Sequence, residues 1–534
     1  MSSQAVHAAP AAATAPADTP ADTHDGNSPA SPTPGRPVTT WRRHLPVILA
    51  GALGGVLLGI ASPPFDLHLL AFIGLVPVII VATDTRRGII AGAVCGFVWF
   101  GFELSWVFSL AWFGWFIVAG WLAVVLVVWG AAAGFLRAIN APFLLRIAAL
   151  PSVLVVAEWL QGRWPGGFAS QLGVLQHNLP FTRAIAAAGG IAIVGWLTVA
   201  ANTAIAEGII RVRARKSPLS IVVPAATLCG VALAFGLGWL FRPSQAPVGT
   251  LAVGIVQAND MPGVRVPSGV MVQAHLDETA NLDGSDYDVI LWSESSLGQY
   301  ELDDFLGEEI AAVSDGTPVL ANSYVNHPSE PLFYNRNALF DESGEVIWTY
   351  DKRKLVPFGE YVPMRNWLRW ITLIQEGVPR DGVRGDEVGI FDIDGHPIGS
   401  LICFEIAIGE LTRETVREGA QAIVVSINNS TYGYSHESEQ MLAVTRMRAV
   451  QSHRAIAVPA VSGASATIQP DGNLTQQTEL FERATLDWDM PLQTDLTISM
   501  RVGDWVLWMS WLLVAAGAVF SVVRVRRRAG AEPA

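Results

Sequence analysis

The sequence predicts a polytopic α-helical membrane base joined to one α/β domain. First, 51% of the 534 residues are hydrophobic and only 15% are charged, which is less charge than a soluble enzyme of this length carries. Second, eight apolar segments each approach the roughly 20 residues that a helix needs to cross a bilayer. Third, residues 243–502 interrupt this series with short β-prone runs and polar, helix-compatible stretches. Such a chain is too long for a single ordinary domain.

The apolar segments define the predicted spanning helices and their orientation. Cytoplasmic loops are rich in Lys and Arg, and basic residues here cluster in alternate loops and at both ends, near residues 42–43, 86–87, 137–146, 211–216 and 524–528. If each cluster is cytoplasmic, all eight helices alternate consistently and both termini lie in the cytoplasm. The predicted helices cover residues 45–62, 67–83, 88–109, 113–136, 147–162, 188–210, 219–241 and 504–523.

This topology sets the predicted domain limits. Residues 1–40 are mostly Ala, Pro, Thr, Ser and Asp with almost nothing to bury, so we expect a disordered cytoplasmic tail. They also lack the basic and apolar regions of a cleavable signal peptide. Seven helices then occupy residues 41–242 and an extracytoplasmic domain occupies 243–502. The eighth helix covers 503–525, and 526–534 form a second cytoplasmic tail.

Charge and cysteine content exclude several classes of function. The net charge of −13 argues against a nucleic-acid partner. The three cysteines, Cys95, Cys229 and Cys403, are too few for a disulfide framework, and no Cys/His cluster has metal-ligand spacing. Cys95 and Cys229 lie in apolar segments and are interpreted as packing residues. Cys403 is therefore the only cysteine of the extracytoplasmic region.

Residues 243–502 alternate between predicted strands and helices. Such alternation predicts layered α/β packing around a sheet, and about 260 residues can bury a core of their own. Strands are predicted at 250–257, 288–293, 317–325, 337–350, 397–404, 421–427 and 455–461, and helices at 270–282 and 436–454.

Cys403 occupies a predicted corner between a strand and a helix. The apolar run 398–406 carries the cysteine near its end and Glu405 two residues later, and residues 407–420 are polar and charged enough to form a helix. A nucleophile at such a corner is exposed on one side, and free backbone N–H groups point at whatever its sulfur attacks. The local stretch is equally typical of a buried core cysteine.

Glu294 is the candidate general base. It ends the apolar run 289–294, so a strand would deliver its carboxylate to a sheet edge. Taken alone, this pattern is also typical of a surface carboxylate at a strand end.

Lys352 is the candidate cation, within the stretch YDKRKLVPFGEY (350–361). Pro357 and Gly359 predict a rigid turn that returns Glu360 toward the same region. A lysine held near a carboxylate keeps its charge and can stabilise a developing oxyanion. The charges alone are also typical of a solvated turn.

These residues together resemble a known family. Glu294, Lys352 and Cys403, separated by 58 and 51 positions (352 − 294 and 403 − 352), resemble the Glu-Lys-Cys triad of the nitrilase superfamily. The stretch K-x-x-L-V-P-F-G-E-Y-x-P that starts at Lys352 resembles the apolipoprotein N-acyltransferase family, its membrane-embedded branch. The resemblance extends from about residue 45 to 523, and its other matching segments are ASPPF (61–65), NSTYG (429–433) and RMRA (446–449).

The resemblance implies an α-β-β-α sandwich of the nitrilase type on the eight-helix base, in the inner (cytoplasmic) membrane of a bacterial cell. It implies that Cys403 is the nucleophile, Glu294 the general base and Lys352 the oxyanion-stabilising cation, with Glu360 in support. A ping-pong reaction would move an acyl chain from a phospholipid to a Cys403 thioester, and then to the α-amine of an S-diacylglyceryl-cysteine lipoprotein. No metal or other cofactor and no nucleic acid is expected. Phe404 and Tyr432 depart from the family, which often has Tyr, and Trp or Phe, at these positions.

Two other classes of function remain open. A membrane-tethered carbon–nitrogen hydrolase (an amidase) would use the same triad with water as the acceptor. The eight predicted helices argue against this class, because an enzyme that acts on a soluble amide needs only one membrane anchor. A transporter with a non-catalytic outer domain would show several charges along a path through the membrane. Few acidic residues, among them Glu103 and Glu158, fall within the predicted spans.

Overall fold

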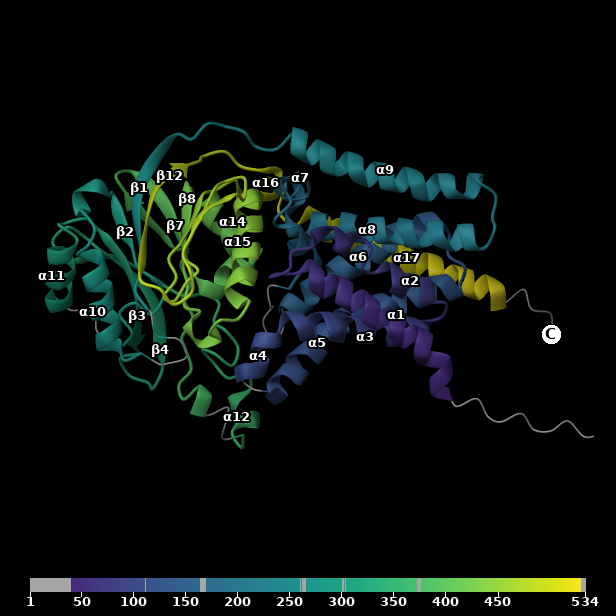
Figure 1. Ribbon diagram of the computed structural model, residues 1–534, viewed down its shortest axis with the longest axis horizontal. Helices are drawn as coiled ribbons and strands as arrows, with labels where there is room; N and C mark the ends of the chain where they lie inside the picture. Colours follow the sequence, from purple (N-terminus) through teal and green to yellow (C-terminus); the bar gives the residue numbers. More distant parts are fainter. Residues whose placement is uncertain are drawn as a thin grey trace, which may run out of the picture. The chain divides into compact units, whose positions relative to one another are not determined.

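The computed structural model describes residues 40–110, 112–163, 170–259, 261, 266–299, 302, 304–371 and 376–529 (Figure 1). The chain divides into Met1–Arg43 and His44–Ala534, and the second unit holds every element discussed below except the first turn of α1. The tail predicted for residues 1–40 falls outside the described part except for its last residue. Of the tail predicted for 526–534, the first four residues belong to the last helix.

Six helices of the described part are long and apolar enough to cross a membrane. Each coincides with a span expected from the sequence, since runs of about 20 apolar residues can satisfy their backbone groups in lipid only as helices. They are α1 (Thr40–Ala61), α5 (Trp112–Ala138), α6 (Phe143–Gln161), α8 (Ala186–Arg213), α9 (Leu219–Leu240) and α17 (Trp505–Ala529).

The other two expected spans are helical but interrupted. Residues 67–83 form a 3₁₀ turn, η1 (His68–Phe72), followed by the short helix α2 (Val76–Val81). Residues 88–109 form α3 (Thr85–Glu103), which ends at Leu104 before the separate helix α4 (Ser105–Leu110). A count of eight spans therefore stays a prediction.

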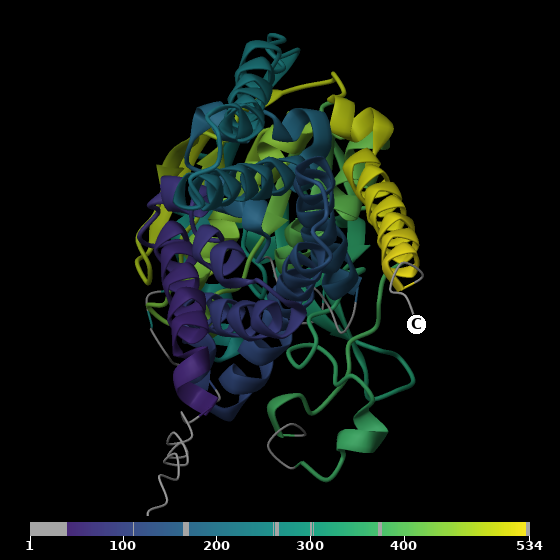
Figure 2. The same cartoon turned by 90° about the vertical axis from the view of Figure 1, so that its right-hand side faces the viewer.

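Small residues bring α3 and α5 into close contact. A Cβ atom at Gly88 would lie 2.0 Å from the carbonyl oxygen of Gly130, and one at Gly92 would lie 2.1 Å from that of Leu126. Glycines four residues apart let two helix backbones approach, which is a common way to pack helices where lipid removes the hydrophobic driving force. Figure 2 shows α1 (purple) and α17 (yellow) on opposite sides of the helical part, with the other helices between them.

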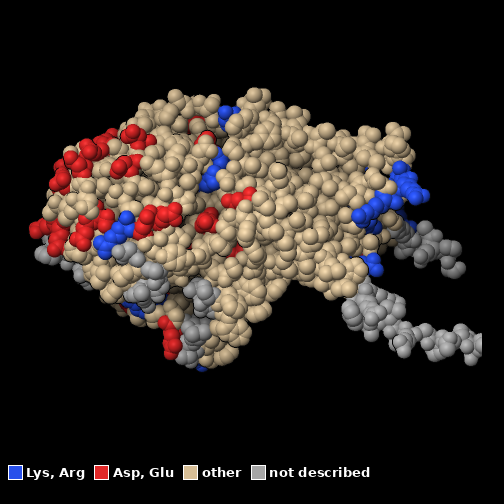
Figure 3. Space-filling view, viewed as in Figure 1, with Lys and Arg blue, Asp and Glu red and all other residues tan. Residues whose placement is uncertain are grey.

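The surface of the helical part suits a lipid environment. Figure 3 shows almost no charged side chains on the face in view, whereas Lys and Arg gather where α8 meets α9 and where α17 ends. Large apolar side chains are exposed there instead, including Leu233, Leu240 and Leu512 at 62%, 68% and 72% exposure. An apolar surface of this kind is stable only when it is covered by lipid or detergent.

The α/β part contains two six-stranded mixed sheets. In the first, β1, β2 and β3 are parallel and the remaining pairs are antiparallel. Its strands, in spatial order, are β12 (Ala484–Leu492), β1 (Gly249–Gln257), β2 (Val289–Leu291), β3 (Val319–Asn326), β4 (Phe333–Phe340) and β5 (Val346–Asp351).

The second sheet has the same plan, with β7, β8 and β9 parallel and the remaining pairs antiparallel. In spatial order its strands are β11 (Leu474–Gln477), β10 (Ala466–Ile468), β9 (Ile456–Val458), β8 (Ala422–Ser426), β7 (His396–Ile402) and β6 (Ile390–Ile393).

The two sheets pack face to face and helices cover both outer faces. One buried cluster joins residues of both sheets, such as Val253 of β1 and Val424 of β8. Apolar residues of α10 (Ser268–Thr279) and α11 (Asp304–Val313) cover the first sheet, and those of α14 (Gly409–Arg417) and α15 (Glu437–Ser452) cover the second. The expected α-β-β-α sandwich is confirmed.

Most sequence expectations for this part are confirmed. Every predicted strand and both predicted helices are present, and the run 337–350 spans parts of two strands, β4 and β5, that form a hairpin. Strands β6, β10, β11 and β12 were not predicted. They are short or partly exposed, so their hydrophobic pattern is weak.

Helix α15 links the sandwich to the helical part. Met441 and Leu442 face the second sheet, whereas Val444 and Met447 pack with α8 residues such as Ile191. The apolar residues of α15 therefore serve two cores at once, and Figure 1 shows this helix between the sheets and the long helices.

Candidate active site

The structure brings together the three residues singled out by the sequence. Glu294 follows β2, Lys352 follows β5, and Cys403 follows β7 as the first residue of the 3₁₀ turn η5 (Cys403–Ala407). Ends of strands from both sheets thus meet at one edge of the sandwich. Glu294, Lys352 and Cys403 are only 3%, 1% and 9% exposed.

Lys352 lies between two carboxylates. Its Nζ atom is 3.1 Å from Oε1 of Glu294 and 3.0 Å from Oε1 of Glu360. Burial alone would lower the pKa of Lys352, but the two carboxylates outweigh burial and hold that pKa well above its usual range. Lys352 is therefore a permanent cation in the site.

Asn335 of β4 holds the same two carboxylates in place. Its side-chain NH₂ group donates to Oε1 of Glu294 and to Oε1 of Glu360, both at 2.7 Å. Its carbonyl oxygen in turn accepts a bond from the Nδ2 group of Asn322, which also donates to Asn337. A fully bonded amide network of this kind rigidifies a buried polar region. The sequence analysis did not identify Asn335, since a single asparagine within a strand gives no recognisable signal.

Glu360 reaches Lys352 through a tight turn, as expected from Pro357 and Gly359. Phe358, between them, adopts the left-handed conformation, with φ of 61°. The turn is closed by the backbone bond from Glu360 N–H to the carbonyl of Val356 at 2.8 Å, and Oε2 of Glu360 accepts from the N–H of Val356 at 2.8 Å. Glu360 is thereby fixed at both carboxylate oxygens.

The backbone at Cys403 is held in an unusual conformation. Its φ of 51° lies in the left-handed region, which few residues other than glycine adopt. The Glu405 carboxylate secures this corner: Oε2 accepts from the N–H of Ile402 at 2.9 Å, and Oε1 accepts from the N–H groups of Arg353 and Lys354 at 2.7 and 3.0 Å. Glu405 thus ties the turn at Cys403 to the segment that carries Lys352. The sequence places this carboxylate two residues after Cys403, but no role was predicted for it.

The Glu294 carboxylate acts electrostatically on the buried thiol of Cys403. The backbone N–H of Asn428 donates to Oε2 of Glu294 at 2.9 Å. Burial, reinforced by the negative charge of Glu294, raises the pKa of Cys403 well above its usual range, although Lys352 and the Asn428 N–H act in the opposite direction. The resting thiol is therefore protonated at neutral pH.

A further carboxyl group, on the first residue of α15, is coupled electrostatically to Glu294 and Cys403. Glu437 is 8% exposed, and its Oε2 atom is buried without a hydrogen-bond partner in the described part of the chain. Burial, followed by repulsion from Glu294, raises the pKa of Glu437 to about 8. The carboxyl is thus neutral at pH 7. When ionised, Glu437 raises the pKa of Cys403 further. This coupling depends on tertiary packing and was not predicted from the sequence.

The site adjoins the helical part of the molecule. The ring of Tyr432, within the turn η6 (Ser430–Tyr432), lies 4.7 Å from the ring of Trp106 in α4 in an edge-on arrangement. In addition, Nε2 of Gln440 in α15 donates to the backbone carbonyl of Glu103, the last residue of α3, at 2.7 Å. The segment that follows Cys403 in the chain therefore contacts the junction between α3 and α4.

Comparisons with known proteins cover both parts of the chain. A family model described as the apolipoprotein N-acyltransferase N-terminal domain matches residues 54–204, and one described as carbon–nitrogen hydrolase matches residues 287–494. The apolipoprotein N-acyltransferase of Geobacter metallireducens is 27% identical over 508 residues, which is 90% of this chain and 95% of that protein. The enzyme of the same name from Vibrio vulnificus is 25% identical over 498 residues, 88% of this chain and 95% of its own.

Among solved structures, an amidase of the nitrilase superfamily from Nesterenkonia AN1 matches 50% of this chain and 100% of its own, with 17% sequence identity and a TM-score of 0.37.

Proposed function

The chain belongs to the apolipoprotein N-acyltransferase family, and we propose that it moves a fatty acyl chain from a membrane phospholipid to the α-amine of the S-diacylglyceryl-cysteine of apolipoproteins. It is a membrane-embedded acyltransferase. The observation that supports this reaction is the buried group of Glu294, Lys352 and Cys403, in which the Lys352 ammonium lies 3.1 Å from the Glu294 carboxylate and both charges act on the thiol.

In the first half-reaction, the Glu294 carboxylate takes the thiol proton and the sulfur attacks the carbonyl carbon of a phospholipid ester. Negative charge develops on the carbonyl oxygen, where the Lys352 ammonium stabilises it. A preorganised donor of this kind commonly contributes roughly 10²–10³ in rate. The ester C–O bond then breaks, the proton passes from Glu294 to the departing alcohol oxygen, and a lysophospholipid leaves Cys403 acylated as a thioester.

In the second half-reaction, the neutral α-amine of the acceptor attacks the thioester carbonyl. The amine proton moves to Glu294, the C–S bond breaks and the thiolate recovers that proton. The products are an amide on the acceptor and a free Cys403 thiol, so atoms and charges balance over the cycle. Formation of an amide from a thioester is energetically favourable, which makes this step effectively one-way.

Exposed aromatic residues near the site support a substrate that is held in a membrane. Trp367 and Trp370 are 80% and 76% exposed and flank the end of the short helix α12 (Arg365–Leu368), a few residues after Glu360. Tryptophan is enriched where proteins meet the headgroup region of a bilayer. Both proposed substrates are anchored in lipid. A site beside the helical base would let them reach Cys403 without leaving the membrane.

We propose the topology predicted from the sequence for this enzyme. The basic ends of α8, α9 and α17 would face the cytoplasm, since Lys and Arg mark that side. The sandwich, within residues 243–502, would then lie outside the inner membrane of a bacterial cell, above helices in 41–242 and 503–525. Accessibility of single engineered cysteines in the sandwich to a membrane-impermeant reagent on intact cells tests this orientation.

The function is tested by mass spectrometry of the purified enzyme after incubation with phospholipid vesicles. We expect a fatty acyl adduct on Cys403 that disappears when a synthetic S-diacylglyceryl-cysteine peptide is added, with N-acylated peptide as the product. The Cys403→Ala variant is the matched control and should form neither.

The same experiment distinguishes the alternatives. A membrane-tethered carbon–nitrogen hydrolase would carry only a transient small acyl group from an amide substrate and would not acylate the peptide. A transporter with an inert outer domain would form no adduct at all. Either result would overturn the proposal.

A further inference from the structure

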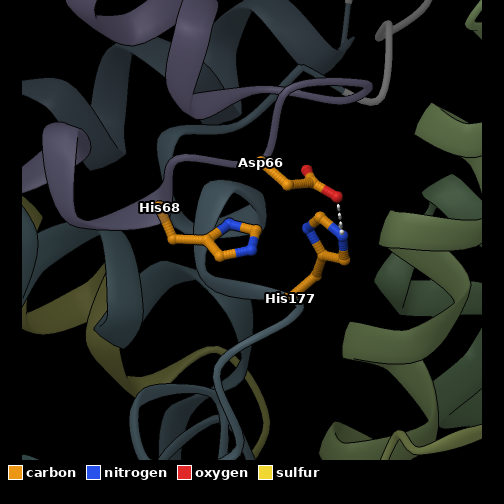
Figure 4. A group of neighbouring side chains, drawn as sticks. All are labelled: Asp66, His68 and His177. Carbon is orange, nitrogen blue, oxygen red and sulfur yellow. Dashed lines mark ion pairs between the residues drawn. The ribbon is translucent and has the colours of Figure 1, made fainter.

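Three side chains outside the active site converge in the outer loops of the helical part. Asp66 and His68 follow α1, and His177 follows the 3₁₀ turn η3 (Leu172–Gln176), 109 positions from His68 (177 − 68). One carboxylate oxygen of Asp66 and one ring nitrogen of each histidine lie within 4.8 Å of one another. Figure 4 shows the three side chains directed toward the same space from two segments of the chain.

Backbone carbonyls determine which ring nitrogens face a ligand. Nδ1 of His68 is 2.9 Å from the carbonyl oxygen of Leu175, and Nδ1 of His177 is 3.2 Å from that of Val174. A carbonyl oxygen only accepts hydrogen bonds, so both Nδ1 atoms carry the proton. In the neutral rings, both Nε2 atoms therefore offer a lone pair. A carbonyl on the second nitrogen is the usual outer partner of a metal-binding histidine.

The spacing of Asp66 and His177 suits a shared cation better than a direct hydrogen bond. Oδ2 of Asp66 lies 3.6 Å from Nε2 of His177, beyond the 2.7–3.2 Å of ordinary N–H···O bonds. Two ligands bound tetrahedrally at about 2.0–2.1 Å from one zinc ion are about 3.3 Å apart. The three ligand atoms lie within 4.8 Å of one another, so His68 would have to approach by up to about 1.5 Å (4.8 − 3.3) to complete the set. The two histidines are 7% and 3% exposed.

The Asp66 carboxylate has one oxygen that can still bind a cation. Oδ1 of Asp66 is buried without a hydrogen-bond partner in the described part of the chain, which is costly for a charged group unless a cation satisfies it. Arg446 of α15 acts on Asp66 electrostatically, but its guanidinium is directed to Asn178 at 3.1 Å and to the carbonyl of Gly472 at 2.9 Å. Glu439 adds negative charge near Asp66.

We propose that Asp66, His68 and His177 bind one divalent transition-metal ion, with zinc as the probe ion. Two imidazoles and one carboxylate suit zinc and its first-row neighbours, and a water molecule would complete a four-coordinate shell. The ion would join the loop after α1 to the loop after η3. The site is separate from Cys403 and is proposed as a structural tie, independent of the proposed acyl transfer.

The proposal is tested by zinc binding to the full-length protein in detergent, purified without a histidine tag and first stripped with a chelator. Calorimetric titration and elemental analysis should give one zinc ion per chain, and the melting temperature should rise when zinc is added. Cobalt(II) added in place of zinc should give the visible absorption spectrum of a nitrogen- and oxygen-liganded ion.

Substitutions identify the ligands. His68→Ala, His177→Ala and Asp66→Asn should each weaken zinc binding about 10-fold or more and abolish the zinc-dependent rise in melting temperature. His327→Ala, a histidine of the sandwich far along the chain, is the matched control and should bind zinc as the wild type does. Asp66 has a φ of 52°, which asparagine also tolerates, so Asp66→Asn should fold normally and melt like the wild type in chelator.

Two results would overturn the proposal. One is a wild-type protein that binds no zinc at micromolar concentration and does not change its melting temperature, which would leave Asp66 and His177 as a simple ion pair. The other is full zinc binding by Asp66→Asn and His68→Ala, which would place the ion elsewhere.

Discussion

The ammonium nitrogen of Lys352 lies 3.1 Å from the Glu294 carboxylate, although 58 positions separate the two residues. Both side chains are almost fully buried. Glu360 places a second carboxylate 3.0 Å from the ammonium, and Asn335 donates a hydrogen bond to each carboxylate. Removing one member of a buried pair typically destabilises a protein by about 3–5 kcal/mol, because the other charge is left without compensation. Substitutions that test chemistry here must therefore keep side-chain shape, and each variant must be checked for folding.

Substitution of the nucleophile should abolish both half-reactions. Cys403→Ala should form no thioester and no N-acylated peptide, and Cys403→Ser should retain at most a trace of activity. A serine hydroxyl has a pKa far above that of a thiol, so the carboxylate base cannot activate it. The measurement is N-acylation of a diacylglyceryl peptide. Normal N-acylation by Cys403→Ala would show that Cys403 is not the nucleophile.

The other two cysteines provide the control. Cys95 is fully buried in α3 and Cys229 is exposed on α9. Changing both to Ala should leave the rate of acyl transfer largely intact, while the loss of packing around Cys95 costs about 1 kcal/mol of stability. A double variant that melts normally but lacks activity would show that Cys403 is not the only functional cysteine.

Glu294 and Lys352 should differ in how they affect the thiol itself. Glu294→Gln keeps shape but removes the base, and Lys352→Met keeps the stem but removes the charge. Neither variant should accumulate thioester at a normal rate. Alkylation by iodoacetamide requires a thiolate but no oxyanion stabilisation, so Glu294→Gln should slow alkylation sharply and Lys352→Met less so, although losing the cation raises the thiol pKa.

A pH series of alkylation rates on these variants provides the measurement. In the wild type the rate should climb as pH rises, because burial and Glu294 raise the pKa of the Cys403 thiol and keep it protonated at neutral pH. Unchanged alkylation in Glu294→Gln would mean that another group activates the thiol.

Glu437 should affect the nucleophile only at alkaline pH. Burial raises its pKa to about 8, so the carboxyl is neutral below that pH and becomes an anion facing Cys403 above it. Glu437→Gln should therefore behave like the wild type at pH 7. At pH 9 it should alkylate about fivefold faster, which corresponds to roughly 1 kcal/mol of charge repulsion removed. Equal rates for the two proteins at both pH values would contradict a charge effect of Glu437.

Asn335 should act by positioning the two carboxylates. Asn335→Ala removes two hydrogen bonds to charged groups, so the rate of thioester formation should fall roughly 10- to 100-fold while KM for phospholipid changes little. Asn326→Ala, on an exposed position of β3, is the matched control. A merely structural role would lower the melting temperature of Asn335→Ala without this selective loss of kcat.

Much of the architecture could be predicted because it depends on local patterns. Runs of apolar residues predict the long helices, and β-prone runs separated by polar stretches predict the central strands of both sheets. The edge strands β11 and β12 escaped prediction because exposed strands have no strong hydrophobic pattern. The spans at 67–83 and 88–109 looked continuous in composition, but breaks near Ile73 and Leu104 divide them.

The sequence by itself determined the two-part architecture and the candidates Glu294, Lys352, Glu360 and Cys403, because strand ends, turn residues and motif spacing are local properties. Only the tertiary structure decided what surrounds them. Asn335, Glu405 and Glu437 join the site because packing of the sheets and helices brings distant segments together. For the same reason Asp66 and His68 meet His177, which lies 109 positions after His68. Burial and charge, which set the pKa of each group, follow from that packing and from no single stretch of sequence.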